Sequence, residues 1–273
     1  MTNGNDADSL AAAAVLLWES DDNIALSLLA RSTALAPDRP EYAWLQLEAC
    51  ARSTTCDVQP QAARLLSLAP DNGAAAMVVL SIADKANDEA ARASALAQLA
   101  HAERVDVYWT TLISRLGPPA AATRKMTLLE AVVAVTGKLV AIAIPAYSSF
   151  SSQCKGDRLH DEKVVENCRA AARAMLRGDT YVTEMIGIVV SKRVWPEKSP
   201  EWKAAFEARR RYSYQSRIGF DFNCCNPHDA AGTKEYLRLL ALYPREQDLL
   251  KAQITAHGLD PDPPEDWVDP SQK

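Results

Sequence analysis

Residues 35–38 read Leu-Ala-Pro-Asp, and residues 68–71 repeat the same four letters after an offset of 33 residues. A third junction, residues 101–106, places its aspartate 35 residues after the second one. Offsets of 33 and 35 bracket the period of about 34 residues that is typical of stacked helix–turn–helix units. A single helix pair cannot bury its apolar face, so we expect neighbouring pairs to stack on one another.

The composition of the 273-residue chain supports an all-helical fold. Only 10 residues are glycine, and about one residue in six is alanine, the best helix former. No segment shows the sustained alternation of apolar and polar residues that predicts a strand. We therefore expect an all-α protein, with a helix-hairpin solenoid followed by an irregular helical domain.

Residues about 8–116 resemble tetratricopeptide (TPR) repeats. Ala25, Leu29, Ser32 and Pro37 have the spacing of that family's small, large, small and proline positions. The repeats are degenerate, because the family's glycine position is not matched and the second repeat is shortened. The resemblance implies a right-handed superhelix whose first helices line a concave, peptide-binding face.

Four aromatic residues lie at first-helix positions of these repeats: Tyr42, Trp44, Tyr108 and Trp109. Aromatic anchors in a groove are typical binding determinants. We therefore expect them to contact a protein or peptide partner. Packing between neighbouring repeats is the alternative role for each of them.

A break is predicted at Gly117-Pro118-Pro119, after which the repeat marks disappear. We therefore expect three parts: repeats at 8–116, a C-terminal helical domain at 117–258 and an acidic tail rich in Pro and Asp at 259–273. The most apolar stretch, 126–146, contains Glu130 and Lys138, so we expect no membrane span.

The basic segment 192–217 is the other candidate surface. Arg209 and Arg210 lie close to Tyr212 and Tyr214, which is a combination suited to a partner contact. Pairing with the acidic tail is the simpler interpretation. The net charge of −5 argues against nucleic acid as the partner.

The cysteines occur as three close pairs, which favours disulfides and an oxidising compartment. They are Cys50 with Cys56, Cys154 with Cys168, and Cys224 next to Cys225. Adjacent cysteines would form a strained bond, so the third pair could have other partners or remain reduced. No typical signal peptide precedes the apolar run at 10–18, so the alternatives are a mature periplasmic or cell-envelope protein, which we favour, and a cytoplasmic one.

One cluster could carry chemistry. Cys224, Cys225 and His228 could contribute to a zinc site or to a nucleophile–base pair, but a fourth zinc ligand is not local. A loop held by disulfides is the simpler reading, so we expect no metal, no cofactor and no catalytic residue.

The sequence thus favours a non-enzymatic protein-binding module of the bacterial cell envelope, such as an immunity protein that neutralises a toxin, or an assembly adaptor. A small-molecule substrate is not expected. An enzyme or zinc protein built on Cys224, Cys225 and His228, or a cytosolic regulatory scaffold, are the alternatives.

Overall fold

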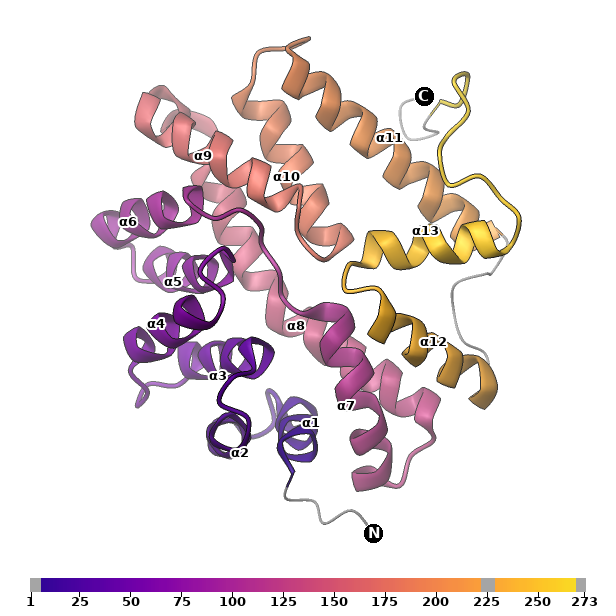
Figure 1. The fold of residues 1–273 in the computed structure, drawn as a ribbon. Coiled ribbons are helices and arrows are strands. Elements are labelled where there is room, and N and C mark those ends of the chain that lie inside the picture. Colours follow the sequence, from indigo (N-terminus) through magenta and orange to yellow (C-terminus); the bar gives the residue numbers. More distant parts are fainter. Residues whose placement is uncertain (1–5, 222–228, 269–273) are drawn as a thin grey trace.

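The computed structural model describes residues 6–221 and 229–268, and Pro145, Phe220 and Asp221 within helices are described by their backbone only. The described residues contain 13 α-helices and no strand, so the all-α prediction is confirmed (Figure 1). In chain order the helices are α1 (Ala7–Leu17), α2 (Asp22–Leu35), α3 (Pro40–Arg52), α4 (Val58–Leu68), α5 (Ala74–Lys85), α6 (Glu89–Ala100), α7 (Trp109–Arg124), α8 (Leu128–Gln153), α9 (Glu162–Met175), α10 (Tyr181–Val194), α11 (Pro200–Asp221), α12 (Ala230–Leu242) and α13 (Glu246–Ala256), with a 3-10 turn at Gly156–His160.

The two Leu-Ala-Pro-Asp segments end α2 and α4 with the same backbone geometry. Ala36 has φ −134° and ψ 70°, and Ala69 has φ −143° and ψ 72°. Each alanine donates its N–H to the carbonyl four residues earlier, and each carbonyl accepts from the N–H three residues later. The third junction is different, because His101 ends α6 in the right-handed helical region. The repeated sequence therefore corresponds to a repeated local turn at the ends of α2 and α4.

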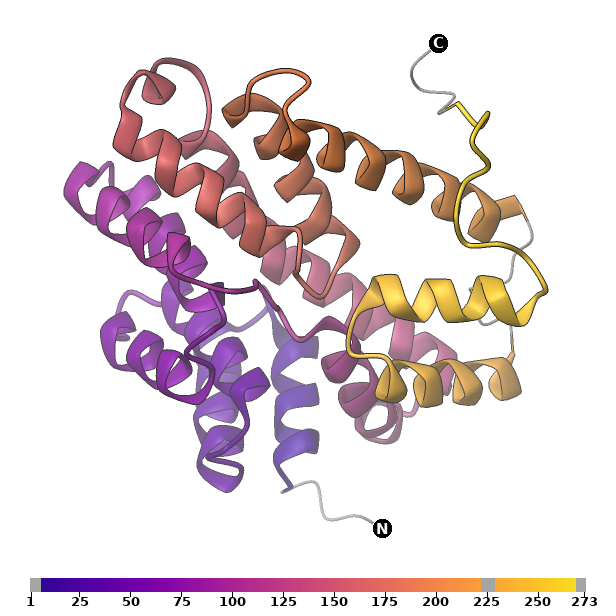
Figure 2. The ribbon, with the colours of Figure 1, turned by 45° about the horizontal axis from the view of Figure 1, so that its top comes forward.

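Helix α8 is the central element of the fold. It packs against α1, α5, α7, α10 and α12, and Figures 1 and 2 show it running behind the junction between the N-terminal helices and α9–α13. Its N-terminus is fixed by a capping box, in which Thr127 and Glu130 satisfy each other's backbone N–H groups. Helix α8 therefore links N-terminal helices to helices of the C-terminal half.

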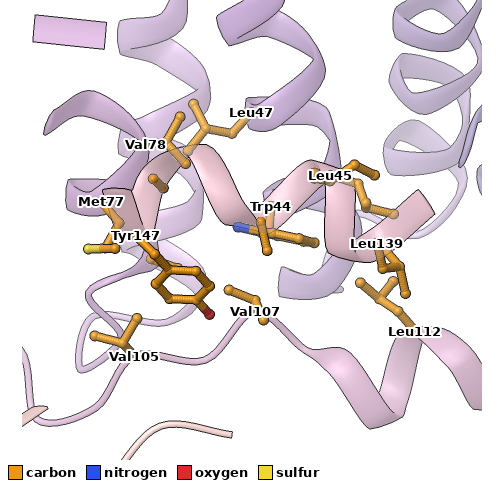
Figure 3. Packing of buried hydrophobic residues seen from close by; sticks show 14 of the residues in the cluster. Trp44, Leu45, Leu47, Met77, Val78, Val105, Val107, Leu112, Leu139 and Tyr147 are labelled. Carbon is orange, nitrogen blue, oxygen red and sulfur yellow. The ribbon is translucent and has the colours of Figure 1, made fainter. Parts of the chain in front are cut away.

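The core is continuous across the chain. Among its largest fully buried side chains are Trp18, Trp44, Tyr42 and Phe150. Figure 3 shows Trp44 of α3 among side chains that come from α5, α7, α8 and the segment before α7. The N-terminal helices and α7–α8 therefore share one hydrophobic core.

The predicted break at Gly117-Pro118-Pro119 is wrong, because these residues lie inside α7. A proline within a helix removes one hydrogen bond and strains the preceding turn. The helix continues because Leu116 and Ala120, on either side of the prolines, are fully buried. The predicted domain division at residue 117 would therefore cut a helix.

Two of the three predicted cysteine pairs lie at disulfide distance. The S–S distance is 1.98 Å for Cys50–Cys56 and 2.06 Å for Cys154–Cys168. Cys224 and Cys225 lie outside the described residues. The two bonds are compatible with an oxidising compartment.

Of the helices that the structure describes, α8 has the length and apolar composition to cross a membrane. Only 35% of its most apolar stretch is buried in the fold. Lys138, near its middle, donates a 2.8 Å hydrogen bond to the backbone oxygen of Trp18 and lies 3.6 Å from the carboxylate of Glu19. A core helix of a soluble protein meets the same criteria of length and composition, so the expected absence of a membrane span stays a prediction.

Candidate functional site: the apolar surface of α8

The structure buries two of the four aromatic residues expected to contact a partner. Tyr42 is 0% exposed and Trp44 is 1% exposed. The hydroxyl of Tyr42 donates a hydrogen bond to Asp8. Both side chains are therefore buried between helices, which agrees with the alternative role of packing between neighbouring repeats.

Tyr108 and Trp109 are half-buried at the start of α7. Tyr108 has φ 58°, and its hydroxyl accepts a 3.0 Å hydrogen bond from Nδ2 of Asn72. Burial is the main reason that the pKa of Tyr108 is raised to about 12. Tyr108 is therefore held by the α4–α5 junction, whereas Trp109 lines a pocket described below.

Asp179 fixes the backbone around these aromatic residues. Its Oδ1 accepts from the N–H of Val107 at 3.0 Å, and its Oδ2 accepts from the N–H of Trp109 at 2.9 Å. The residue is 3% exposed, and this burial raises the pKa of its carboxyl above the usual range. The preceding residue, Gly178, approaches the same segment so closely that an added Cβ would lie 2.5 Å from the backbone oxygen of Val105.

Three helices begin next to Asp179: α7 at Trp109, α10 at Tyr181 and α13 at Glu246. The N–H of Glu246 donates to the backbone oxygen of Asp179 at 2.8 Å. The Glu246 side chain in turn accepts from the N–H of Tyr181 through Oε2, also at 2.8 Å. Two carboxyl groups thus satisfy N–H groups that helix N-termini leave unpaired.

Burial raises the pKa of Glu246 to about 7, although the hydrogen bond from Tyr181 favours the charged form. The carboxyl therefore exchanges its proton near neutral pH. A cation placed beside it would stabilise the charged form.

A pocket of about 230 Å³ opens next to these N-termini. In the described part of the chain its wall is mostly apolar, with Glu246 as the one carboxylic acid. Among the residues that line it are Trp109, Val140, Ile144, Tyr147, Val182 and Glu246. Trp109 is the predicted site residue that the structure does place at a pocket.

An exposed apolar strip extends from this pocket along α8. Val133 is 62% exposed, Val140 41% and Ile144 50%, and Val182 of α10 is 48% exposed. Positions 133, 137, 140 and 144 follow the 4-3-4 spacing of one helix face, and Gly137 is also exposed. We call Val133, Gly137, Val140, Ile144 and Val182, with the adjoining pocket, the α8 surface.

Most of this surface was not predicted from the sequence. The 4-3-4 spacing was visible in the apolar stretch 126–146, but that stretch is apolar nearly all round. The spacing alone does not indicate which face of the helix other helices cover. Only the packing of α1, α5, α7, α10 and α12 decides it.

Arg210 is occupied by the C-terminal tail. It donates to the backbone oxygens of Pro264, Glu265 and Trp267, and lies 3.4 Å from the carboxylate of Glu207. The basic segment and the tail do meet, although through backbone carbonyls. Arg209 is half-buried on the same helix.

A second pocket, of about 160 Å³, lies between α10, α11 and α13. It contains charges of both signs, among them Glu184, whose carboxylate lies 4.0 Å from the guanidinium of Arg211. Gln247 donates to the backbone oxygens of Gly178 and Thr180. These polar groups support the α9–α10 loop, so we assign this pocket a structural role.

The cluster of Cys224, Cys225 and His228 lies outside the described residues, so its predicted roles are untested. In the described part of the chain, no three His, Cys, Asp or Glu side chains are grouped as metal ligands would be. The α8 surface is therefore the candidate site with the clearest geometry. Searches against family models, curated proteins and solved structures find no match to this chain.

Proposed function

We propose that this protein is a non-enzymatic protein-binding module of the bacterial cell envelope, and that it holds its partner on the α8 surface. The observation that supports the proposal is the exposure of Val133, Val140 and Ile144 on one helix face beside an apolar pocket. Contiguous exposed apolar side chains are costly in water and commonly mark protein interaction sites.

The character of the pocket favours binding over catalysis. Catalytic sites bring several polar groups to one reacting atom, whereas the described residues of this pocket place one carboxyl group in an apolar wall. The hydroxyl of Tyr147, which also lines the pocket, is already hydrogen-bonded to Thr183 at 2.6 Å. Trp109, Val140 and Val182 provide apolar surface that a partner side chain can contact.

The cysteine pairs support the envelope location. Cys50–Cys56 and Cys154–Cys168 are both formed, and such bonds persist in oxidising compartments. The bacterial periplasm is one such compartment.

The proposal is tested by capture from an envelope extract with immobilised wild-type protein, Ile144→Glu and Leu35→Glu. Leu35 is the matched control, because it is 58% exposed on α2 and is not part of the α8 surface. We expect one partner to be retained by the wild type and by Leu35→Glu and to be lost from Ile144→Glu. Equal retention by all three proteins would contradict the use of this surface, and retention of no protein would contradict the binding role.

A further inference from the structure

The size of the pocket limits what can enter it. Pockets for drug-sized ligands usually have volumes of about 300–1,000 Å³. The pocket at Trp109, Val140 and Glu246 has about 230 Å³, which is suited to one large side chain. An anchor residue of a partner protein therefore fits better than a whole small-molecule ligand.

The strip beside the pocket has the form of a helix-packing seam. Val133 and Ile144 are 11 residues apart, which is about 16 Å along an α-helix. The 4-3-4 spacing of Val133, Gly137, Val140 and Ile144 is the spacing of apolar residues where two helices pack side by side. A Cβ added at Gly137 would meet nothing within 4 Å, so the seam has an open notch at its centre.

The carboxyl group of Glu246 bears on which residues a partner can place at the pocket. Among the described residues that line the pocket, Glu246 is the only carboxylic acid, and the hydrogen bond from the N–H of Tyr181 to its Oε2 uses only part of the acceptor capacity of a carboxylate. The chain as a whole carries a net charge of −5. A cationic side chain is the complement of this site.

From these observations we propose that the α8 surface binds an amphipathic helix of a partner protein, with an apolar anchor in the pocket and a lysine or arginine beside Glu246. This inference rests on the proposed function and specifies the partner's chemistry. The binding mode is helix-in-groove recognition, with anchors at successive turns of the partner helix.

Two other occupants are less suited to the same surface. A second copy of this chain would bring another net charge of −5 to the interface. An anionic membrane would be repelled by the same charge and by Glu246. Both occupants are outcomes of the test below.

The test uses three fluorescent 18-residue helical peptides with leucines at the 4-3-4 spacing. They differ only in the residue one turn beyond each terminal leucine, which is Lys, Gln or Glu. Binding to the full chain is measured by anisotropy at pH 8, where Glu246, with its pKa of about 7, is mostly ionised. The proteins are the wild type, Glu246→Gln, Ile144→Glu and the control Leu35→Glu.

We expect the wild type and Leu35→Glu to bind the Lys peptide about tenfold more tightly than the Glu peptide. In Glu246→Gln this ratio should fall below about twofold, because glutamine keeps the size and the acceptor for Tyr181 but not the charge. Ile144→Glu should lose binding of all three peptides.

Three results would overturn the inference. The first is a Lys peptide that does not bind, or that shows no preference over the Glu peptide. The second is a dimer of the wild type in light scattering that Ile144→Glu abolishes. The third is sedimentation of the wild type, but not of Ile144→Glu, with phosphatidylglycerol vesicles. If an extract partner still depends on Ile144 while the peptides show no charge preference, the proposed function stands and only this inference fails.

Discussion

The backbone N–H of Trp109 donates a 2.9 Å hydrogen bond to Oδ2 of Asp179, a residue 70 positions later in the chain. The other carboxylate oxygen of Asp179 accepts from Val107, so one side chain holds the segment that leads into α7. The same aspartate lies beside the N-termini of α10 and α13. The wall of the α8 pocket therefore depends on this carboxylate.

Replacing Asp179 with Asn should reduce the free energy of unfolding by about 1–3 kcal/mol. An amide has only one oxygen, so one of the N–H groups of Val107 and Trp109 would face another N–H donor. Urea unfolding followed by circular dichroism measures the change. Asp157→Asn, at an exposed position, is the control and should leave the midpoint unchanged; equal midpoints for the two variants would refute the role given to Asp179.

Replacing Gly178 with Ala should also reduce the free energy of unfolding, by about 1–3 kcal/mol. The added Cβ would lie 2.3 Å from Cγ2 of Thr183 and 2.5 Å from the oxygen of Val105. Gly137→Ala is the matched control, because its Cβ would meet nothing within 4 Å inside α8. That variant should gain about 0.5–1 kcal/mol from helix propensity, and thermal unfolding of the pair should show shifts of opposite sign. Shifts of the same sign would mean that the close approach at Gly178 is not as described.

Raising the pH should lower the free energy of unfolding between about pH 4 and pH 7. Asp179 and Glu246 have pKa values raised by burial, the latter to about 7, so the folded state binds more protons than the unfolded state in this range. Their stabilising contribution is present at low pH and is lost as the pH passes the folded-state pKa. Urea titrations at pH 5 and pH 8 should show that the free energy of unfolding falls less in Glu246→Gln than in the wild type.

The control for that measurement is Glu197→Gln, since Glu197 is exposed in the loop before α11. It should keep the wild-type difference between pH 5 and pH 8. A Glu246→Gln protein that keeps the full difference would exclude Glu246 as a source of the pH dependence.

Removing the disulfides should destabilise the protein, and the bond that closes the longer loop should contribute more. The sequence separation is 14 residues for Cys154–Cys168 and 6 for Cys50–Cys56. The loop-entropy relation gives losses of about 3 and about 2 kcal/mol for the corresponding double Ser variants. In the denatured, non-reduced wild type, no more than two of the six cysteines should react with a thiol reagent; six reactive thiols would contradict both bonds and the oxidising compartment.

Features of the fold that depend on a few neighbouring residues, such as turns and close cysteine pairs, could be predicted from the sequence. The repeated Leu-Ala-Pro-Asp segments do mark a repeated local turn, at the ends of α2 and α4. The pairing of Cys154 with Cys168 across a turn was also correct. These features depend on short-range chemistry, which a single sequence displays directly.

Features that depend on distant packing were not predictable in the same way. Pro118 and Pro119 indicated a break, but burial of Leu116 and Ala120 keeps α7 intact. The spacing of Trp44 left both partner contact and packing between helices open, and only the fold shows that the side chain is buried.

The candidate site shows the same limit. Trp109 was identified from the sequence, whereas Ile144 and Glu246 were not. Ile144 could not be singled out because α8 is apolar on most sides. Glu246 lines the pocket because α13 begins beside Asp179, whose backbone oxygen accepts from the N–H of Glu246.

Site-specific photo-crosslinking in envelope extract tests the central claim most directly. A benzophenone amino acid is placed at Val140, which is 41% exposed on the α8 surface, or at Leu35 of α2 as the control. The account predicts a crosslinked partner from position 140 that is not obtained from position 35. A partner crosslinked equally from both positions, or only from position 35, would contradict binding at the α8 surface.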